Sequence, residues 1–493
     1  MASPHPVHDA PPPTVAGLPR TLFPVAALTV FDSSTFFGLQ SLLVFYIYFA
    51  TDEGGLGFSM ESAIAVSAAL GAATYLGTIV MGWYADRVTG AARMLRTGPW
   101  IAAAGYLLLA FVPGAIGLGL GLVTVMFGAA AMWIGESATV GGTLDRFPGK
   151  RDAGFTVYYI GGALGAFVGV ALAGVLQNTV GFTVGFVVSA VALVIGRLLY
   201  GRFRRGPEQT APRVAPEAAA TPRQVLGVTL LVLSCVIALA VAVALGLNPA
   251  TLLGIGALLI AAVFFIQILG RRTVAPAVKR RVVEYLPFFV ATIVFNGLYQ
   301  QLYSTVAVHS DTSTDRMLLG MEIPPSSVLA AAPLCSIFLA PLLAALWGKL
   351  GERGPSLAAK FSAAFVLSAG ALMLLALTAS AEARTPLLVV ATTVFALGAA
   401  DVVLTPSGLA LASEVGPPEF TTRMIAIQYL AIAGGIALAG TTGAWFLPGE
   451  NEGLYFGICA AIGFAVAAGM AVTAVRARRR AQRTRAPQET LAG

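Results

Sequence analysis

Three carboxylates interrupt long apolar runs, at Asp32 (in VFDSSTFFG, residues 30–38), Glu136 and Asp401. An ionisable side chain at membrane depth costs about 2.5–3.5 kcal/mol on insertion scales, so it indicates a functional site. No lysine or arginine accompanies them at mid-span. A buried carboxylate without a cationic partner favours its protonated form and can exchange a proton near neutral pH. We interpret the three acids as proton-coupling groups; the alternative for each is a protonated or hydrated acid at a helix contact.

A polar face follows in the segment FNGLYQQLY. Asn296, Tyr299, Gln300 and Tyr303 recur at i, i+3, i+4 and i+7 and therefore share one side of a helix. A polar side in an otherwise apolar span predicts a solute cavity, with interhelical hydrogen bonding as the alternative. His309, near the outer end of the same span, is expected to be a solvated loop residue.

The segment YYIGGALGAFVG combines two features. Gly161, Gly165 and Gly169 are four residues apart and predict a seam for close helix approach. Tyr158 and Tyr159 at the cytoplasmic end of this span either line the substrate pathway or belong to the aromatic belt of the membrane interface.

Two short loops repeat a glycine, an acid and an arginine, as GWYADR (82–87) and GKLGER (348–353). Their spacing equals that between Glu136 and Asp401 to within one residue, which predicts two bundles related by duplication. Asp86 with Arg87 and Glu352 with Arg353 are predicted to gate the cytoplasmic side; the alternative is a pair of solvated turns.

These residues must be positioned by membrane-spanning helices. The chain of 493 residues is 57% hydrophobic and only 11% charged, with a mean hydropathy of +0.83. This excludes an ordinary soluble protein. About fourteen apolar runs, from 22–50 to 453–475, are long enough to span a bilayer, which takes roughly 20 residues. The fold class is therefore all-α, because such runs do not suit a barrel of alternating strands.

A charged, Pro/Ala-rich break after the sixth run divides the chain. Two six-helix bundles are expected, with a two-helix hairpin inserted between them. The expected parts are a disordered cytoplasmic N-terminus (1–20), an N-terminal bundle (21–201), a cytoplasmic linker (202–224), the hairpin (225–272), a C-terminal bundle (280–476) and a basic cytoplasmic tail (477–493).

Lysine and arginine fall on alternate loops, with Arg316 and Arg384 as exceptions. This pattern predicts that both termini are cytoplasmic, in a multi-pass protein of the plasma membrane. The net charge of +7 borders the spans, so no nucleic acid partner is implied. Cys235, Cys335 and Cys459 lie within spans and exclude a disulfide framework. The chain carries no HExxH motif or convincing GxSxG elbow, and neither an enzyme, a metal site nor an organic cofactor is expected.

Four segments resemble signatures of the proton-dependent oligopeptide transporter family of the major facilitator superfamily. They are GWYADRVTG (82–90), RDAGFTVYYIGGALGAFVG (151–169), the run from IPPSS to AAKF (323–361) and DVVLTPSGLALASEVGP (401–417). The resemblance extends from about residue 22 to 440. It implies the major facilitator fold, alternating access and proton coupling, and it suggests a monomer.

The stretch around Asp32 falls on the family's first-span motif ExxERFxYYG. Thr29 stands where the first acid is expected, Asp32 where the second is, and Ser33 where an arginine is. Phe36 and Phe37 replace two tyrosines. In the family this motif serves proton coupling, and its arginine helps to hold the peptide carboxylate.

Other positions depart from the family in the same way. No lysine occurs near Ile134, Gln300 replaces a glutamate that receives the peptide amino end, and Ala332 replaces an asparagine. Asp401 replaces a glutamate, and Gln428 falls near an aromatic position and is expected to line the cavity. A zwitterionic dipeptide needs a cation for its desolvated carboxylate, and this clamp is missing.

The resemblance therefore implies proton-coupled transport of a small molecule, either a peptide or a peptide-like organic solute. The predicted substrate-binding residues are Phe36, Tyr158, Tyr159, Asn296, Tyr299, Gln300, Tyr303 and Gln428. The alternatives are a proton-driven exporter of a drug-like or biosynthetic product and a non-transporting solute sensor with the same fold.

Overall fold

The computed structural model describes residues 14–15, 17–145, 147, 150–203, 214, 219–351, 354–379, 384–415 and 421–489. Within these residues, fourteen helical spans are long and apolar enough to cross a membrane. The predicted all-α membrane protein of fourteen helices is thus confirmed. Helices satisfy their own backbone hydrogen bonds, which lipid cannot do.

Six spans form the first bundle, and local signals mark several of their ends. Ser59 caps one helix by accepting a hydrogen bond from the Ser62 amide. Gly90 and Gly181 directly precede two other helices. Both have a positive φ, a conformation that favours glycine. The helices are α1 (Leu22–Tyr48), α2 (Met60–Tyr84), α3 (Ala91–Phe111), α4 (Gly114–Leu144), α5 (Arg151–Val180) and α6 (Phe182–Phe203).

The inserted hairpin consists of α8 (Pro222–Ala244) and α9 (Pro249–Gly270). Thr221 and Gln224 form a capping box at the start of α8. None of the residues of α8 is buried, whereas α9 buries a small-residue face against α16 and α2. The hairpin therefore packs through α9 against α16 of the second bundle and α2 of the first, and α8 lies on the outside.

The second bundle has two interrupted spans. The first is α10 (Pro276–Gln300), which continues after a 3-10 turn as α11 (Thr305–Thr312). The next is α12 (Pro325–Val328) followed by α13 (Ala331–Leu350). The remaining spans are α14 (Leu357–Thr378), α15 (Leu387–Val415), α16 (Thr421–Thr442) and α17 (Glu452–Glu489).

The element boundaries differ in places from the ranges expected from sequence. The segment 1–20 is ordered at its end, where β1 (Thr14–Val15) pairs antiparallel with β2 (Leu18–Pro19). Leu18 is buried beside Leu22, which explains this order. Most of the linker, at 204–213 and 215–218, lies outside the described residues, and α17 stays helical to Glu489.

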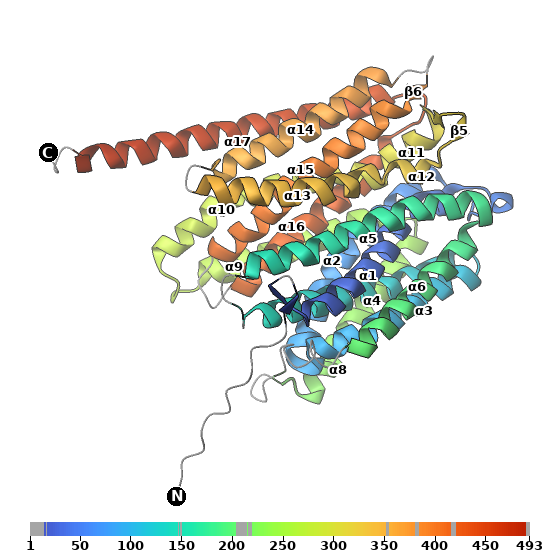
Figure 1. Ribbon diagram of the computed structural model, residues 1–493, viewed down its shortest axis with the longest axis horizontal. Coiled ribbons are helices and arrows are strands. Elements are labelled where there is room, and N and C mark those ends of the chain that lie inside the picture. The colour runs from blue at the N-terminus through green and yellow to red at the C-terminus, as the bar shows by residue number, and fades with distance from the viewer. Residues whose placement is uncertain are drawn as a thin grey trace, which may run out of the picture.

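The described residues also form three pairs of two-residue strands. Besides β1 and β2, β3 (Thr314–Asp315) pairs parallel with β6 (Thr385–Pro386), and β4 (Met317–Leu318) pairs antiparallel with β5 (Met321–Glu322). The last two pairs lie at the opposite end of the molecule from the start of α1 and the end of α17 (Figure 1).

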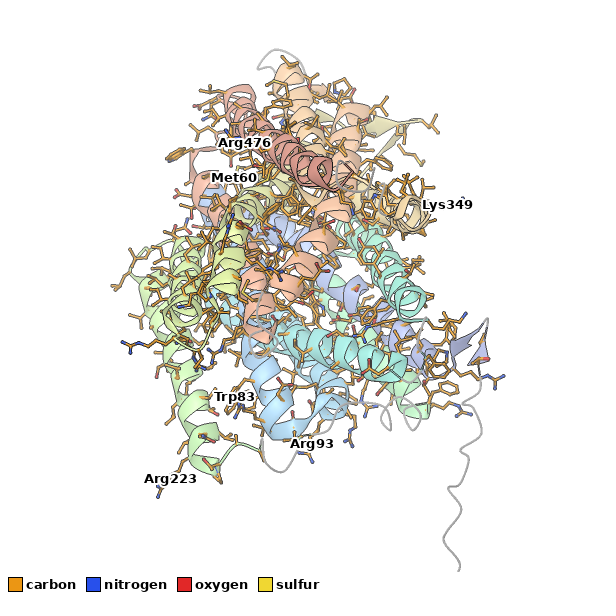
Figure 2. All side chains as sticks on the ribbon, turned by 90° about the vertical axis from the view of Figure 1, so that its left-hand side faces the viewer. Met60, Trp83, Arg93, Arg223, Lys349 and Arg476 are labelled. Carbon is orange, nitrogen blue, oxygen red and sulfur yellow. The ribbon has the colours of Figure 1, made fainter. Side chains whose placement is uncertain are left out.

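The long helices run roughly side by side, with the start of α1 and the end of α17 toward one end (Figure 1). Figure 2 looks at the molecule from that side, with Arg93 and Arg223 below and Lys349 and Arg476 above. We call this the basic end and the opposite one the far end. The far end contains α11, α12 and the strands β3 to β6.

The two bundles are joined at the far end by hydrogen bonds between side chains or from side chains to backbone. The donor and acceptor pairs are Tyr48 with Asp311, Ser67 with the Tyr303 carbonyl, Ser326 with Gln177, and Ser327 with the Ala171 carbonyl. Toward the basic end, α13 has no buried residue from position 337 to 350. The hydrogen bonds between the bundles therefore lie at the far end, while α2 of the first bundle also packs against α16 of the second.

The predicted glycine seam is confirmed as a contact between α5 and α1. A Cβ at Gly165 would overlap the Val30 backbone, and one at Gly169 would lie 2.6 Å from the Ser34 Cα. A Cβ at Gly161 would come within 3.1 Å of the Ala26 carbonyl oxygen. The seam brings α1 and its acid close to α5.

Candidate functional site

Asp32 and Glu136 are placed near one another, on α1 and α4. Their side chains are 1% and 0% exposed, so both are sealed from the molecular surface. Neither carboxylate oxygen of Asp32 has a hydrogen-bond partner, and the same holds for Oε1 of Glu136. The hydroxyl of Tyr158 donates to Glu136 Oε2 at 3.3 Å. The Asp32 charge acts on Glu136, which links the two acids electrostatically.

The surroundings of this acid pair hold uncharged donors. The indole of Trp133 lies beside Asp32, and Thr29 lies beside Glu136. Neither α1 nor α4 contains a lysine or arginine. The single arginine of α5, Arg151, is exposed at its first residue and pairs with Asp145 at 2.7 Å. Two buried acids without a cation cannot both stay ionised at low cost.

Asp401 occupies a separate position on α15. It is half-buried, and its Oδ1 accepts a hydrogen bond from Thr405 at 2.5 Å. The rings of Tyr299 and Tyr303 contact each other, with centroids 6.4 Å apart. This pair lies where α10 passes into the turn Gln301–Tyr303.

Aromatic rings connect this tyrosine group with the first bundle. Tyr75 contacts Tyr429 and Trp133, with ring centroids 5.9 and 5.7 Å apart. Phe37 contacts Tyr303 at 6.4 Å. These rings, from α1, α2, α4, α16 and the turn after α10, form an aromatic wall between the bundles.

The structure differs from the sequence-based expectation at three predicted binding residues. Phe36 is buried behind Phe37 and packs against Trp133. Asn296 donates to the Thr292 carbonyl of its own helix, and its Cβ lies at the close contact with Gly435 of α16.

Gln428 likewise forms hydrogen bonds inside the second bundle. It accepts from Tyr285 at 2.5 Å and donates to Thr292 at 3.3 Å. Gln428 thus joins α16 to α10 by hydrogen bonds, whereas Asn296 meets α16 only by packing against Gly435. Gln300 is different, because its Nε2 is buried without a hydrogen-bond partner.

Sequence reasoning did not select Phe37, Tyr75, Trp133 and Tyr429 as wall residues. An isolated aromatic residue in an apolar span carries no periodic signal that separates a cavity wall from a lipid contact. The one available clue was the first-span motif, which marks Phe37 as well as Phe36.

The two predicted gates lie at the basic end. Asp86 and Arg87 are exposed in the π-helical turn Ala85–Thr89, and the Arg87 carbonyl accepts from the Ala220 amide at 2.9 Å. Glu352 and Arg353 lie outside the described residues. Both gates therefore stay predictions.

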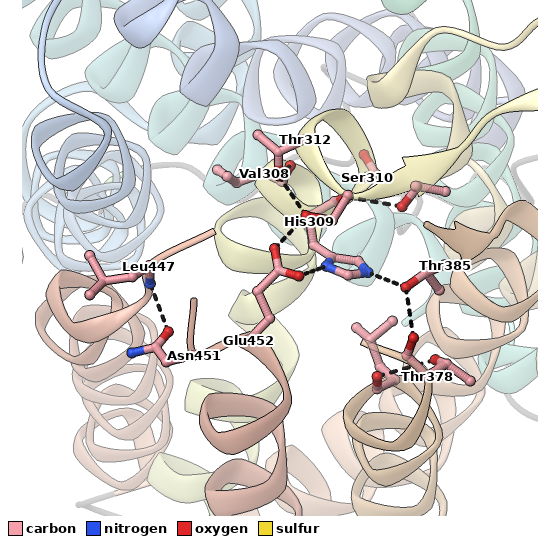
Figure 3. A network of polar contacts seen from close by, with 12 residues as sticks. Val308, His309, Ser310, Thr312, Thr378, Thr385, Leu447, Asn451 and Glu452 are labelled. Carbon is pink, nitrogen blue, oxygen red and sulfur yellow. Dashed lines mark hydrogen bonds and ion pairs between the residues drawn. The ribbon is translucent and has the colours of Figure 1, made fainter. Parts of the chain in front are cut away.

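A polar network at the far end corrects the expectation for His309. This side chain is 0% exposed, and its ring lies between Glu452 and Thr385 (Figure 3). Nδ1 is 3.1 Å from Glu452 Oε2, and Nε2 is 3.1 Å from Thr385 Oγ1. Ser313 donates to the other oxygen of Glu452 at 2.7 Å. The break after α10 turns α11 inward, which a sequence pattern of one histidine near a span end does not indicate.

Replacing His309 with leucine is expected to lower the free energy of unfolding by about 1–3 kcal/mol, because Glu452 and Thr385 lose a buried partner. The measurement is the thermal unfolding midpoint of the purified full chain. Thr312→Val is the control, since Thr312 bonds only to its own helix at Val308 and to the neighbouring Ser313. Equal midpoints for the two variants would contradict a structural role for the network.

Comparison with known proteins places this architecture in a family. The POT family profile matches residues 97–446. The chain is 26% identical over 450 residues to the uncharacterized transporter YclF of Bacillus subtilis (strain 168), covering 90% of each chain. It is 26% identical over 438 residues to the di-/tripeptide transporter of Lactococcus lactis subsp. cremoris, covering 85% of this chain and 88% of that one.

A solved structure agrees with these relatives. The crystal structure of peptide transporter POT in complex with sulfate superimposes with a TM-score of 0.86 at 26% identity, covering 95% of this chain and 96% of the other. This confirms two six-helix bundles with an inserted hairpin. The family match spans well over half of the chain, and the protein belongs to the POT family of membrane transporters.

Proposed function

We propose that this protein moves peptides or peptide-like small organic solutes across the plasma membrane by alternating access, and that Asp32 and Glu136 carry the coupling proton. The observation that supports the proton site most directly is their shared burial without a cation. Two carboxylates in one low-dielectric site hold a proton between them, because ionising both is costly. Tyr158 connects this pair to α5, the helix that also carries Tyr159.

Alternating access is supported by where the bundles touch. Hydrogen bonds join them at the far end, and residues 337–350 of α13 include no buried residue. With the basic end in the cytoplasm, as the charge pattern predicts, these hydrogen bonds hold the bundles together on the outer side. Rocking of the two bundles would break the far-end contacts and close the basic end. Protonation of the acid pair shifts the equilibrium between the two states if the pair has a different proton affinity in each state.

The names of the relatives favour peptide transport over the two alternatives of an exporter and a sensor. The Lactococcus protein is named a di-/tripeptide transporter. A single chain contains both bundles and both acids, so the unit that transports is proposed to be a monomer.

Proteoliposomes containing the purified full chain test this function. An outward-acidic gradient of one pH unit is expected to drive about tenfold accumulation of a transported solute per proton, since one unit corresponds to 1.36 kcal/mol. A panel of labelled di- and tripeptides and peptide amides serves as substrate, and a protonophore is the control. Accumulation that survives the protonophore would contradict proton coupling, and binding without flux across the whole panel would indicate a sensor.

A further inference from the structure

A pair of hydroxyl groups joins the inserted hairpin to the first bundle. The hydroxyl of Tyr84, the last residue of α2, is 2.6 Å from Oγ1 of Thr229 on α8. Thr229 donates its own proton to the Val225 carbonyl at 2.7 Å. Because a hydroxyl has one proton, Tyr84 is the donor in the bond between the two helices. Removing the Tyr84 hydroxyl would therefore break the bond between helices and leave the local bond of Thr229 intact.

A second bond reaches the same corner of the molecule. The Ala220 amide, just before α8, donates to the carbonyl of Arg87 at 2.9 Å. Arg87 belongs to the turn Ala85–Thr89 at the end of α2, which contains one of the predicted gates. Trp83 of α2 and Arg223 of α8 mark this corner in Figure 2. The start of the hairpin is thus attached to the first bundle at the basic end.

The other end of the hairpin is attached to the second bundle. Asn248, in the turn between α8 and α9, donates to the Gly440 carbonyl of α16 at 3.4 Å. Thr251 Oγ1 of α9 is 2.9 Å from Thr441 Oγ1 of α16. A Cβ at Gly440 would lie 2.6 Å from the Ala250 Cβ, so the two helices meet closely. This attachment lies at the far end, because α8 starts at the basic end and is long enough to cross the membrane.

The helix α8 depends on these two attachments. None of its residues is buried, so packing against the rest of the protein does little to fix its position. Thr229 lies two turns inside this apolar span. Lipid offers no replacement partner at that depth, so the hydroxyl of Tyr84 gains more from Thr229 than it would in water.

A helix attached to a different bundle at each end is affected by any rocking between the bundles. One end of α8 is bound to α2 at the basic end, and the other is bound to α16 at the far end. Rocking changes the distance between two such diagonal points, whereas the length of a helix is fixed by its backbone hydrogen bonds. The helix α8 therefore cannot keep both attachments unchanged while the bundles move.

We propose that the inserted hairpin is a strut that stabilises the conformation in which far-end hydrogen bonds join the two bundles. Tyr84 and Thr229 are positioning residues in this proposal. Their bond holds the turn that contains Asp86 and Arg87 in place, and it is released when the far-end contacts separate. The proposal rests on the proposed transport by alternating access and gives the two inserted helices a role in it.

Spin-label distances in the purified full chain test the strut without requiring transport. The labels are attached through Glu53→Cys and Glu450→Cys, at two exposed far-end positions in different bundles. The native residues Cys235, Cys335 and Cys459 are first replaced by alanine. Double electron–electron resonance then measures the ratio of molecules with separated far ends to molecules with joined far ends.

Single hydroxyl groups are then removed in this background. Tyr84→Phe keeps the ring and its contact with Trp83, with centroids 5.2 Å apart. It is expected to raise the ratio of separated to joined far ends about threefold, which corresponds to an interhelical hydrogen bond of average strength, about 0.6 kcal/mol. Thr229→Val should have the same effect, and Thr229→Ser, which keeps the hydroxyl, should behave as wild type. Ser234→Ala is the matched control, because the Ser234 hydroxyl bonds to the Leu230 carbonyl of its own helix.

An unchanged or lower ratio in both Tyr84→Phe and Thr229→Val would overturn the strut, and so would an equal rise in Ser234→Ala. The outcome for the strut is separate from the outcome for transport. A raised ratio in a chain that shows no uptake into proteoliposomes keeps the strut and removes the transport function. Normal proton-driven uptake together with an unchanged ratio keeps transport and removes the strut.

Discussion

Asp32→Asn is expected to lower proton-driven accumulation at least about tenfold while leaving solute counterflow intact. Asparagine has nearly the same shape but cannot exchange a proton, so the coupling step is lost and the solute pathway is kept. Asp32 makes no side-chain hydrogen bond through either oxygen, and the substitution breaks no such contact. The measurement compares gradient-driven uptake with counterflow at equal pH in proteoliposomes.

Two controls accompany this variant. Asp52→Asn changes an exposed acid in the turn Thr51–Glu53 that follows α1 and should behave as wild type. Glu136→Gln should reproduce the Asp32→Asn result, because the two acids form one site. Normal accumulation by Asp32→Asn would remove it from the coupling mechanism, and a loss of counterflow as well would assign it to the pathway instead.

Gly169→Ala is expected to destabilise the fold strongly. A Cβ at this position would lie 2.6 Å from the Ser34 Cα, and backbone atoms cannot move aside as a flexible side chain can. Overpacking of this kind costs about 1–3 kcal/mol or more. The thermal midpoint and the monodisperse yield of the purified chain report the effect.

Gly119→Ala supplies the matched control, because a Cβ there has no neighbour within 4 Å. Alanine favours helix by about 1 kcal/mol over glycine, so this variant should be as stable as wild type or slightly more so. A stability of Gly169→Ala equal to that of Gly119→Ala would show that α1 and α5 are not in close contact.

The spans, the all-α class and the division into six, two and six helices could be predicted from the sequence. Hydropathy is a property of each segment, and bilayer thickness sets the length that a span needs. The seam at Gly161 and Gly169 was predictable for a similar reason. Small residues four apart lie on one side of a helix, whatever that helix meets.

Tertiary structure decided which residues the side chains of the predicted polar side contact. Asn296 and Tyr299 belong to the same predicted polar side, but Asn296 packs against Gly435 of α16 while the Tyr299 ring contacts Tyr303. A few tens of degrees of helix rotation separate the two outcomes, and the spacing of residues does not set that rotation.

By itself the sequence determined which side chains are costly in a membrane, namely Asp32, Glu136 and Asp401, because that cost depends on residue type and span. Only the tertiary structure paired Asp32 with Glu136, brought Tyr75 against Trp133 and Tyr429, and buried His309 against Glu452. These arrangements join helices distant in the chain, and they follow from how whole helices pack rather than from any local pattern.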